Sequence, residues 1–126
     1  MQTRNSVARL AAVAGLSVAV VGCAQYGRVK AQMHFKDGTS AYMKQDYRTA
    51  AAEYEEAVLA NPDLTYAYFY LANSYDNLYK PSRAGEPEND ALLKKALEHY
   101  KLSAEKETDV ARKKLALQYT VALYGA

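Results

Sequence analysis

The sequence predicts an all-α fold, and three observations support this class. Only six Gly and three Pro occur among 126 residues, so the two residue types that interrupt helices are scarce. Apolar residues recur every three or four positions, which is the period of an amphipathic helix. One pattern of small and aromatic residues also returns along the chain, which indicates stacked helix pairs that share a core.

We expect five helices and one inserted loop. The expected helices cover about 30–44, 47–60, 64–79, 88–106 and 108–123. Pro62 follows the end of the second helix, because proline disfavours the helical conformation in the residue before it. Pro87 suits the start of the fourth helix. Residues 80–87 hold two of the three Pro residues together with Gly85, and therefore predict a loop.

Two blocks of residues carry the repeated pattern. They read Tyr68-x-x-Leu71-Ala72-x-x-Tyr75, and Ala50-x-x-x-Tyr54 followed by Pro62. These blocks resemble the tetratricopeptide repeat, in which two antiparallel helices approach closely at small residues and a large aromatic residue fills the adjoining space. The resemblance covers about residues 30–125. It implies about two repeats of antiparallel helix pairs, an α-solenoid, followed by a C-terminal capping helix.

The register of the repeat follows from matching aromatic residues. Phe35 is expected to mirror Tyr68, which lies 33 positions later, one fewer than the 34 of the family. The resemblance places the missing residue beside Gln45, where family members carry an additional Gly. Tyr54 is expected to mirror Tyr100, 46 positions later, so about 12 inserted residues separate them. This insertion agrees with the expected loop.

The fifth helix matches the repeat poorly, because Lys114 stands where a large aromatic residue is expected. Three interpretations remain open: a weak first helix of a third repeat, a cap on the open end of the stack, or a chain that continues past Ala126. The last apolar residues look as if a partner helix should cover them; they are Leu117, Val121, Leu123 and Tyr124.

Residues 1–22 have the composition of a secretory signal. Arg4 and Arg9 precede the apolar run 10–22, and this segment holds no acidic residue. The run is shorter than the roughly 20 residues of a membrane-spanning helix. Without the two arginines, the 16 basic residues fall to 14, which equals the 14 acidic residues. The neutral remainder lacks the basic surface of a nucleic-acid-binding protein.

The apolar run ends in Val20-Val21-Gly22-Cys23, which resembles the bacterial lipobox. The resemblance implies cleavage before Cys23 and attachment of diacylglycerol to its sulfur, with further acylation of the new amino terminus. Ala24, by the same resemblance, points to the outer membrane. The alternative is an ordinary signal cleaved at the small residues around Cys23.

The expected organisation therefore has three parts. Residues 1–22 form the signal peptide, 23–32 hold the lipid attachment site and a tether, and 33–126 form the repeat domain with the 80–87 loop.

The sequence offers no catalytic or metal-binding constellation, and we expect neither enzyme activity, a metal site nor a cofactor. The single Cys is expected to carry lipid, and His34 and His99 have no nucleophile beside them in a triad order. No Gly-rich phosphate loop occurs.

In the family, the first helix of each pair lines a concave groove that binds partner segments. Carried over residue by residue, the groove is lined by Met33, Lys36, Ser40, Met43, Tyr66, Phe69, Asn73 and Asp76. The weak third unit adds Arg112 and Tyr119. One subset of the family binds C-terminal carboxylates through Lys and Asn; Lys36 fits this scheme, whereas Ser40 replaces the expected Asn.

The expected function is a lipid-anchored protein–protein interaction scaffold of the cell envelope, on the periplasmic face of the outer membrane, that binds a partner peptide or helix. The alternatives are a structural module that self-associates through the fifth helix, and a fragment of a longer repeat protein.

Overall fold

A computed structural model describes the backbone of residues 2–125 and the side chains of residues 22–125. Within this range the chain is all-helical, without a strand: α1 (Gln2–Met43), α2 (Tyr47–Ala60), α3 (Thr65–Leu78), η1 (Pro81–Arg83), α4 (Pro87–Lys106) and α5 (Val110–Tyr124). The all-α class is confirmed. The bounds of α2 to α5 agree with the expected helices to within two residues.

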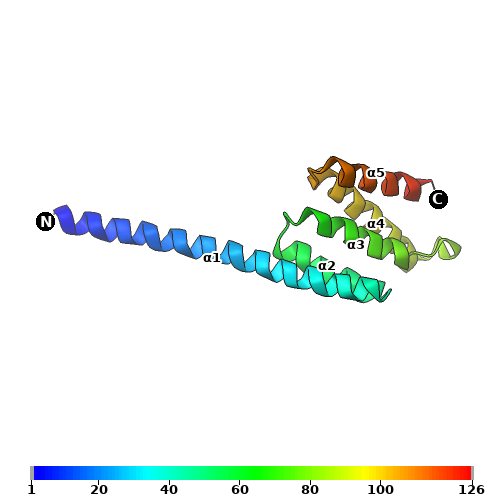
Figure 1. Cartoon of the computed structure of the whole chain (residues 1–126), viewed down its shortest axis with the longest axis horizontal. Coiled ribbons are helices and arrows are strands. Elements are labelled where there is room, and N and C mark those ends of the chain that lie inside the picture. Colours follow the sequence, from blue (N-terminus) through cyan, green and yellow to red (C-terminus); the bar gives the residue numbers. More distant parts are fainter. Residues whose placement is uncertain (1, 126) are drawn as a thin grey trace.

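Each α-helix packs against the next one along the chain, so the domain is a series of adjacent helix pairs. Figure 1 shows α3 lying between α1 and α5, while the N-terminal part of α1 extends away from the domain. Over the described residues, none of the helices combines the length and the apolar character needed to cross a membrane.

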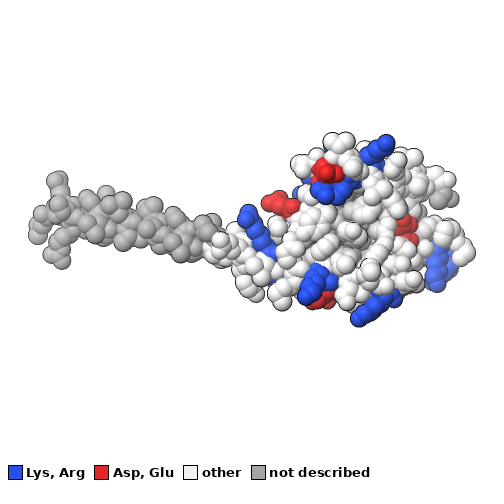
Figure 2. All heavy atoms as spheres, in the orientation of Figure 1, with Lys and Arg blue, Asp and Glu red and all other residues white. Residues whose placement is uncertain are grey.

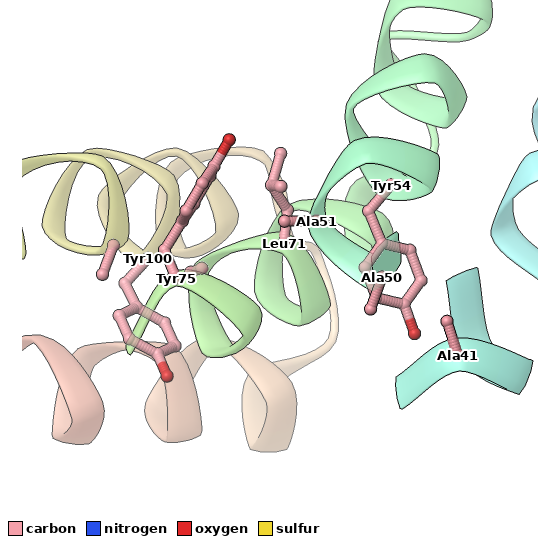
Figure 3. Packing of buried hydrophobic residues seen from close by; sticks show 9 residues of the cluster. Ala41, Ala50, Ala51, Tyr54, Leu71, Tyr75 and Tyr100 are labelled. Carbon is pink, nitrogen blue, oxygen red and sulfur yellow. The ribbon is translucent and has the colours of Figure 1, made fainter. Parts of the chain in front are cut away.

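The core combines small residues with large aromatic ones. Its main cluster holds Ala41, Ala50, Ala51, Tyr54, Leu71, Ala72, Tyr75, Ala96 and Tyr100. In Figure 3 Tyr54 extends from α2 toward Ala41 of α1. The Ala side chains let the helices approach, and the Tyr rings fill the space that remains, as close packing requires. No buried polar side-chain atom of the described residues lacks a hydrogen-bond partner.

The two fully buried tyrosines, Tyr54 and Tyr100, make matching aromatic contacts. The ring of Phe35 lies 5.3 Å from the ring of Tyr54, and the ring of Phe69 lies 5.6 Å from that of Tyr100. Phe35 therefore corresponds to Phe69, 34 residues later. The expected match of Phe35 with Tyr68 is wrong by one residue, because an aromatic residue occupies both positions and either one could be aligned.

Hydrogen bonds repeat with the same spacing. The hydroxyl of Tyr54 donates to Thr39 Oγ1 at 3.2 Å, and the amide of Asn73 donates to the hydroxyl of Tyr100 at 2.9 Å. Thr39 and Asn73 are also 34 residues apart. Two independent contacts thus support one register.

The turn between α1 and α2 does not lack a residue. Gln45 has φ of +61°, the left-handed conformation that glycine adopts most easily. Gln45 itself stands where the additional Gly was expected, which restores the 34-residue spacing. Asp46 then begins α2, and its carboxylate accepts a hydrogen bond from the backbone N–H of Thr49 at 3.2 Å.

Helix α1 docks on α2 through two glycines. A Cβ atom on Gly27 would lie 2.7 Å from the carbonyl oxygen of Ala60, and one on Gly38 would lie 2.8 Å from the ring of Tyr54. Ala31, between them, is fully buried. Packing thus begins ahead of residue 30, where the first helix was expected to start. The signal segment 1–22, apart from Gly22, lies outside the described side chains, and the three-part organisation stays a prediction.

A buried carboxylate fixes α5 to the rest of the domain. Glu107, between α4 and α5, accepts hydrogen bonds from Arg112 at 2.8 and 3.2 Å and from the backbone N–H groups of Thr108 and Asp109 at 3.0 Å. The hydroxyl of Thr65 on α3 donates to it at 3.3 Å. The bond to Arg112 is the largest of the effects that lower the pKa of Glu107, to about 2. Glu107 therefore joins three helices.

Candidate functional site

Aromatic side chains from α1, α3 and α5 form one continuous surface. We call it the aromatic face and define it as Phe35, Tyr42, Tyr66, Phe69, Tyr70 and Tyr119. Tyr70 and Tyr119 each keep 37% of their surface exposed, whereas Phe35 and Phe69 are half-buried and also contact the core. The face therefore combines a packed base with accessible rings.

Tyr70 is the central residue of this face. Its ring lies 5.6 Å from Phe35, 6.0 Å from Tyr42 and 5.8 Å from Phe69, each in an edge-to-face arrangement. Such geometry places the positive edge of one ring against the negative face of another. Tyr70, on α3, thus joins the rings of α3 to those of α1.

Tyr119 extends the face onto α5. Its ring is stacked on that of Tyr100 at 5.3 Å and meets Phe69 edge-on at 5.5 Å. Of the α5 residues, Ala116 is the one that is fully buried. The position of Tyr119 thus depends on how α5 is docked, and hence on Glu107.

A chain of hydrogen bonds runs beneath the aromatic rings. The hydroxyl of Tyr42 donates to the amide oxygen of Asn73, the amide nitrogen of Asn73 donates to the hydroxyl of Tyr100, and that hydroxyl donates to Asp76 Oδ2 at 3.1 Å. Burial raises the pKa of Asp76. Burial also raises the pKa of Tyr42, and nearby Tyr119 and Asp76 are among the smaller contributors. Hydroxyl groups from three helices therefore gather near one carboxylate.

A small hollow lies between α3 and α5 beside this face. Its lining residues are Tyr66, Phe69, Tyr70, Ser103, Glu107, Arg112 and Leu115, and its volume is about 140 Å³. Sites for whole small molecules measure roughly 300–1,000 Å³. A cavity of about 150 Å³ holds one benzene ring. The hollow therefore suits a single apolar side chain better than a metabolite.

On one side of the domain the charged residues leave the middle free. Figure 2 shows the Lys, Arg, Asp and Glu side chains of the visible side mostly around the edge of the domain, with a broad uncharged area between them. Such a surface does not attract a polyanion.

Comparison with protein-family models, with curated proteins and with solved structures gives no match.

The structure brings together the site residues predicted on α3. Tyr66, Phe69, Asn73 and Asp76 share one side of α3 and contact residues of α1, α4 or α5. Tyr119, predicted with the weak third unit, joins the aromatic face, and Arg112 lines the hollow. Whether these residues bind a partner stays a prediction.

The residues predicted on α1 lie apart from this face. Met33 and Met43 are 62% and 79% exposed, and Lys36 and Ser40 are exposed as well. Met33 and Lys36 instead line a shallow apolar depression with Arg28, Val29 and Gln32. The physical reason is the one-residue error in register, which turns a helix by about 100°.

The α1 residues that do meet α3 were missed. They are Gln32, Phe35 and Tyr42, which lie 34 residues before Tyr66, Phe69 and Asp76. Gln32 Nε2 donates to the hydroxyl of Tyr66 at 2.8 Å. The available signal was the pair Phe35 and Phe69, which repeats at 34 without a gap. The carboxylate-binding scheme loses its basis as well, because Lys36 is not on the aromatic face.

A second hollow, of about 600 Å³, lies under the inserted loop. Its basic lining residues include Arg83 and Lys95, but Arg83 is paired with Glu86, and Lys95 Nζ lies 3.7 Å from Glu55. Arg48 and Lys80 are its other basic lining residues, and Glu88 also lines it, so charges of both signs surround this hollow.

The remaining candidates have structural partners. His34 lies 2.7 Å from Glu53 and joins α1 to α2, while His99 Nδ1 lies 2.7 Å from the carbonyl oxygen of Lys95. Among the described residues no group of His, Cys, Asp and Glu could hold a metal ion. Cys23 lies on α1 and is exposed.

Proposed function

We propose that the chain is an interaction scaffold that binds a segment of a partner protein on the aromatic face. The observation that carries this proposal is an accessible aromatic surface contributed by three helices and already ordered by edge-to-face contacts. Tyr and Phe are enriched at protein interfaces because they bury much area and lose little conformational entropy. The hollow beside Phe69 offers a place for one anchoring side chain.

We also propose that the helix pairs are tetratricopeptide repeats. Supporting this assignment are the 34-residue spacing of the Phe–Tyr contacts and the close approach at Gly38, next to Tyr54. The expected family geometry puts the first helix of each pair on the concave side, which here means α1, α3 and α5.

The anchor forms the second half of the proposal. The lipobox-like series ending at Cys23 supports attachment of diacylglycerol to the exposed thiol, and Ala24 supports delivery to the outer membrane, with the domain in the periplasm. Two or more acyl chains hold a protein stably at a membrane, whereas one gives marginal binding.

The scaffold is tested by co-purification from membranes of cells that make the full chain. Tyr66→Ala and Tyr119→Ala each remove an accessible ring of the aromatic face, and Tyr124→Ala removes an exposed ring outside it. We expect the same protein to co-purify with the parent chain and with Tyr124→Ala, and to be lost with both variants of the face. Capture that is equal in all four samples would contradict the proposal, provided that circular dichroism shows equal helix content.

The anchor is tested by intact mass and cell fractionation. The parent chain is expected to lose residues 1–22, gain the mass of the lipid and fractionate with the membrane, while Cys23→Ala is expected to do none of these. A Cys23→Ala protein that still carries lipid would disprove the assignment.

Self-association is the second candidate function, and the outer side of α5 favours it. Leu117 and Val121 are exposed there, Val121 to 71%, and they line an apolar depression. Sedimentation of the full chain in detergent would detect a dimer, and Val121→Glu should dissociate it. A monomer at all concentrations would remove this candidate.

A further inference from the structure

Asp76 carries a negative charge that the packing of the domain does not explain. Its carboxylate is half-buried and accepts one hydrogen bond, from Tyr100 at 3.1 Å. The ion pairs formed by the described residues do not include it. An Asn side chain would accept the same hydrogen bond without the cost of desolvating a charge.

The surroundings of Asp76 favour a positive charge. In the hydrogen-bond chain, Tyr42 donates to Asn73, Asn73 donates to Tyr100, and Tyr100 donates to the carboxylate of Asp76. The chain therefore ends at this carboxylate. Tyr100 contacts the carboxylate directly, Tyr119 is stacked on Tyr100, and Tyr42 is linked to Tyr100 through Asn73, so phenol rings from α1, α4 and α5 lie near the site. The faces of such rings attract cations, and the attraction grows as water is excluded.

The hollow between α3 and α5, unlike the surroundings of Asp76, suits an apolar group. It is lined mainly by apolar rings, and Arg112 at its edge is already paired with Glu107. Along α3, Phe69 in the hollow and Asp76 are seven residues apart, which corresponds to about 10 Å. An extended segment covers that distance with roughly three residues.

We propose that Asp76, with the rings of Tyr42 and Tyr119, binds an Arg or Lys side chain of the partner segment. An apolar residue about three positions away on that segment fills the hollow between α3 and α5. This inference rests on the proposed scaffold function and specifies what kind of segment the aromatic face takes.

The test uses two small probes of equal shape and different charge. N-acetyl-arginine amide is cationic, and N-acetyl-citrulline amide is its neutral analogue. Each is titrated into the full chain, isotope-labelled and held in neutral detergent, while NMR follows the side-chain amide of Asn73 and the rings of Tyr42 and Tyr119. We expect saturable shifts at these groups with the arginine probe, and an affinity at least ten-fold lower for the citrulline probe.

Two variants separate the charge from the fold. Asp76→Asn keeps an acceptor for Tyr100 and removes the charge, and we expect it to reduce binding of the arginine probe at least ten-fold. Asp37→Asn removes an exposed carboxylate elsewhere on α1 and should change nothing. Because Asp76→Asn also removes a desolvated charge, its melting temperature should equal or exceed that of the parent chain. A purely structural Asp76 would instead lower it.

Different results would contradict the cation site and the scaffold proposal. Equal binding of the two probes, or arginine binding that survives Asp76→Asn, overturns the cation site while leaving the scaffold proposal intact. A cation site that behaves as expected, in a protein whose partner capture ignores Tyr66→Ala and Tyr119→Ala, would instead refute the scaffold.

Discussion

Glu107 is the residue whose ionisation most directly affects stability. Its pKa is lowered to about 2, first by the hydrogen bond from Arg112, whereas an unfolded chain has a Glu pKa near 4.3. A lowered pKa stabilises the folded state at pH values above the unfolded pKa. This stabilisation, up to about 3 kcal/mol at 1.36 kcal/mol per unit, is lost as the pH falls from about 4.5 toward 2.

Glu107→Gln should remove this pH dependence. The amide leaves the Arg112 guanidinium without its carboxylate, and we expect a loss of about 2 kcal/mol at pH 7. The difference in stability between the two proteins should shrink as the pH falls from about 4.5 toward 2, as measured by urea unfolding across the pH range. Glu105→Gln, which alters an exposed i,i+4 pair with Lys101 at 4.0 Å, is the control and should cost well under about 1 kcal/mol. A constant difference at all pH values would contradict the role of Glu107.

Gln45 holds a backbone conformation that suits glycine. A residue with a Cβ atom in the left-handed conformation destabilises the folded state by about 1–2 kcal/mol. Glycine removes this penalty, but it also increases the conformational entropy of the unfolded chain, which offsets part of the gain. We therefore expect Gln45→Gly to stabilise the protein by about 0.5–1 kcal/mol in urea unfolding. The same change in the middle of α5, Gln118→Gly, should destabilise by a similar amount. Equal signs for the two variants would refute this reading of the turn.

At the level of elements, the contact between α1 and α2 depends on small residues. Gly38→Ala would bring a Cβ atom to 2.8 Å from the ring of Tyr54, which is fully buried and cannot move freely. We expect a loss of about 1–2 kcal/mol, because overpacking outweighs the better helix propensity of Ala. Ser40→Ala, on the exposed side of α1, should be neutral or slightly stabilising. A Gly38→Ala protein as stable as the parent would show that α1 and α2 do not pack so closely.

The helix bounds were predictable because local signals determine them. Pro62 and Pro87 act within a few residues, and α2 ends at Ala60 and α4 begins at Pro87, as these signals indicate. The register between helices was harder, since it depends on which of two adjacent aromatic residues, Tyr68 or Phe69, packs against the ring of Tyr100. Two Phe residues 34 positions apart carried that information, and the gap introduced at Gln45 concealed it.

The candidate site was only half predictable for the same reason. Residues on α3 were assigned correctly to one side of the helix, because the pattern from Tyr68 to Tyr75 fixes its orientation. Those on α1 inherited the register error. The role of Glu107 could not be foreseen, because its partners on three elements meet only after the chain has folded.

For the whole molecule, the path of α1 determines how the domain is oriented relative to Cys23. One unbroken helix carries both Cys23 and the residues that pack against α2 from Gly27 onward, so an anchor at Cys23 would act through a stiff arm. Turning that arm would turn the aromatic face. One Ala inserted after Gln25 rotates the domain by about 100° about the helix axis, whereas seven inserted residues bring it back to within about 20°.

We therefore expect partner capture at the membrane to fall with a one-residue insertion and to recover with seven. Cross-linking in intact cells would measure this, and the Cys23→Ala protein, free of the arm's attachment, should be indifferent to either insertion. Equal capture by all insertion lengths would show that the connection swivels. The attachment point on α1 would therefore set where the domain is held, and the phase of the helix would set the direction in which the aromatic face is oriented.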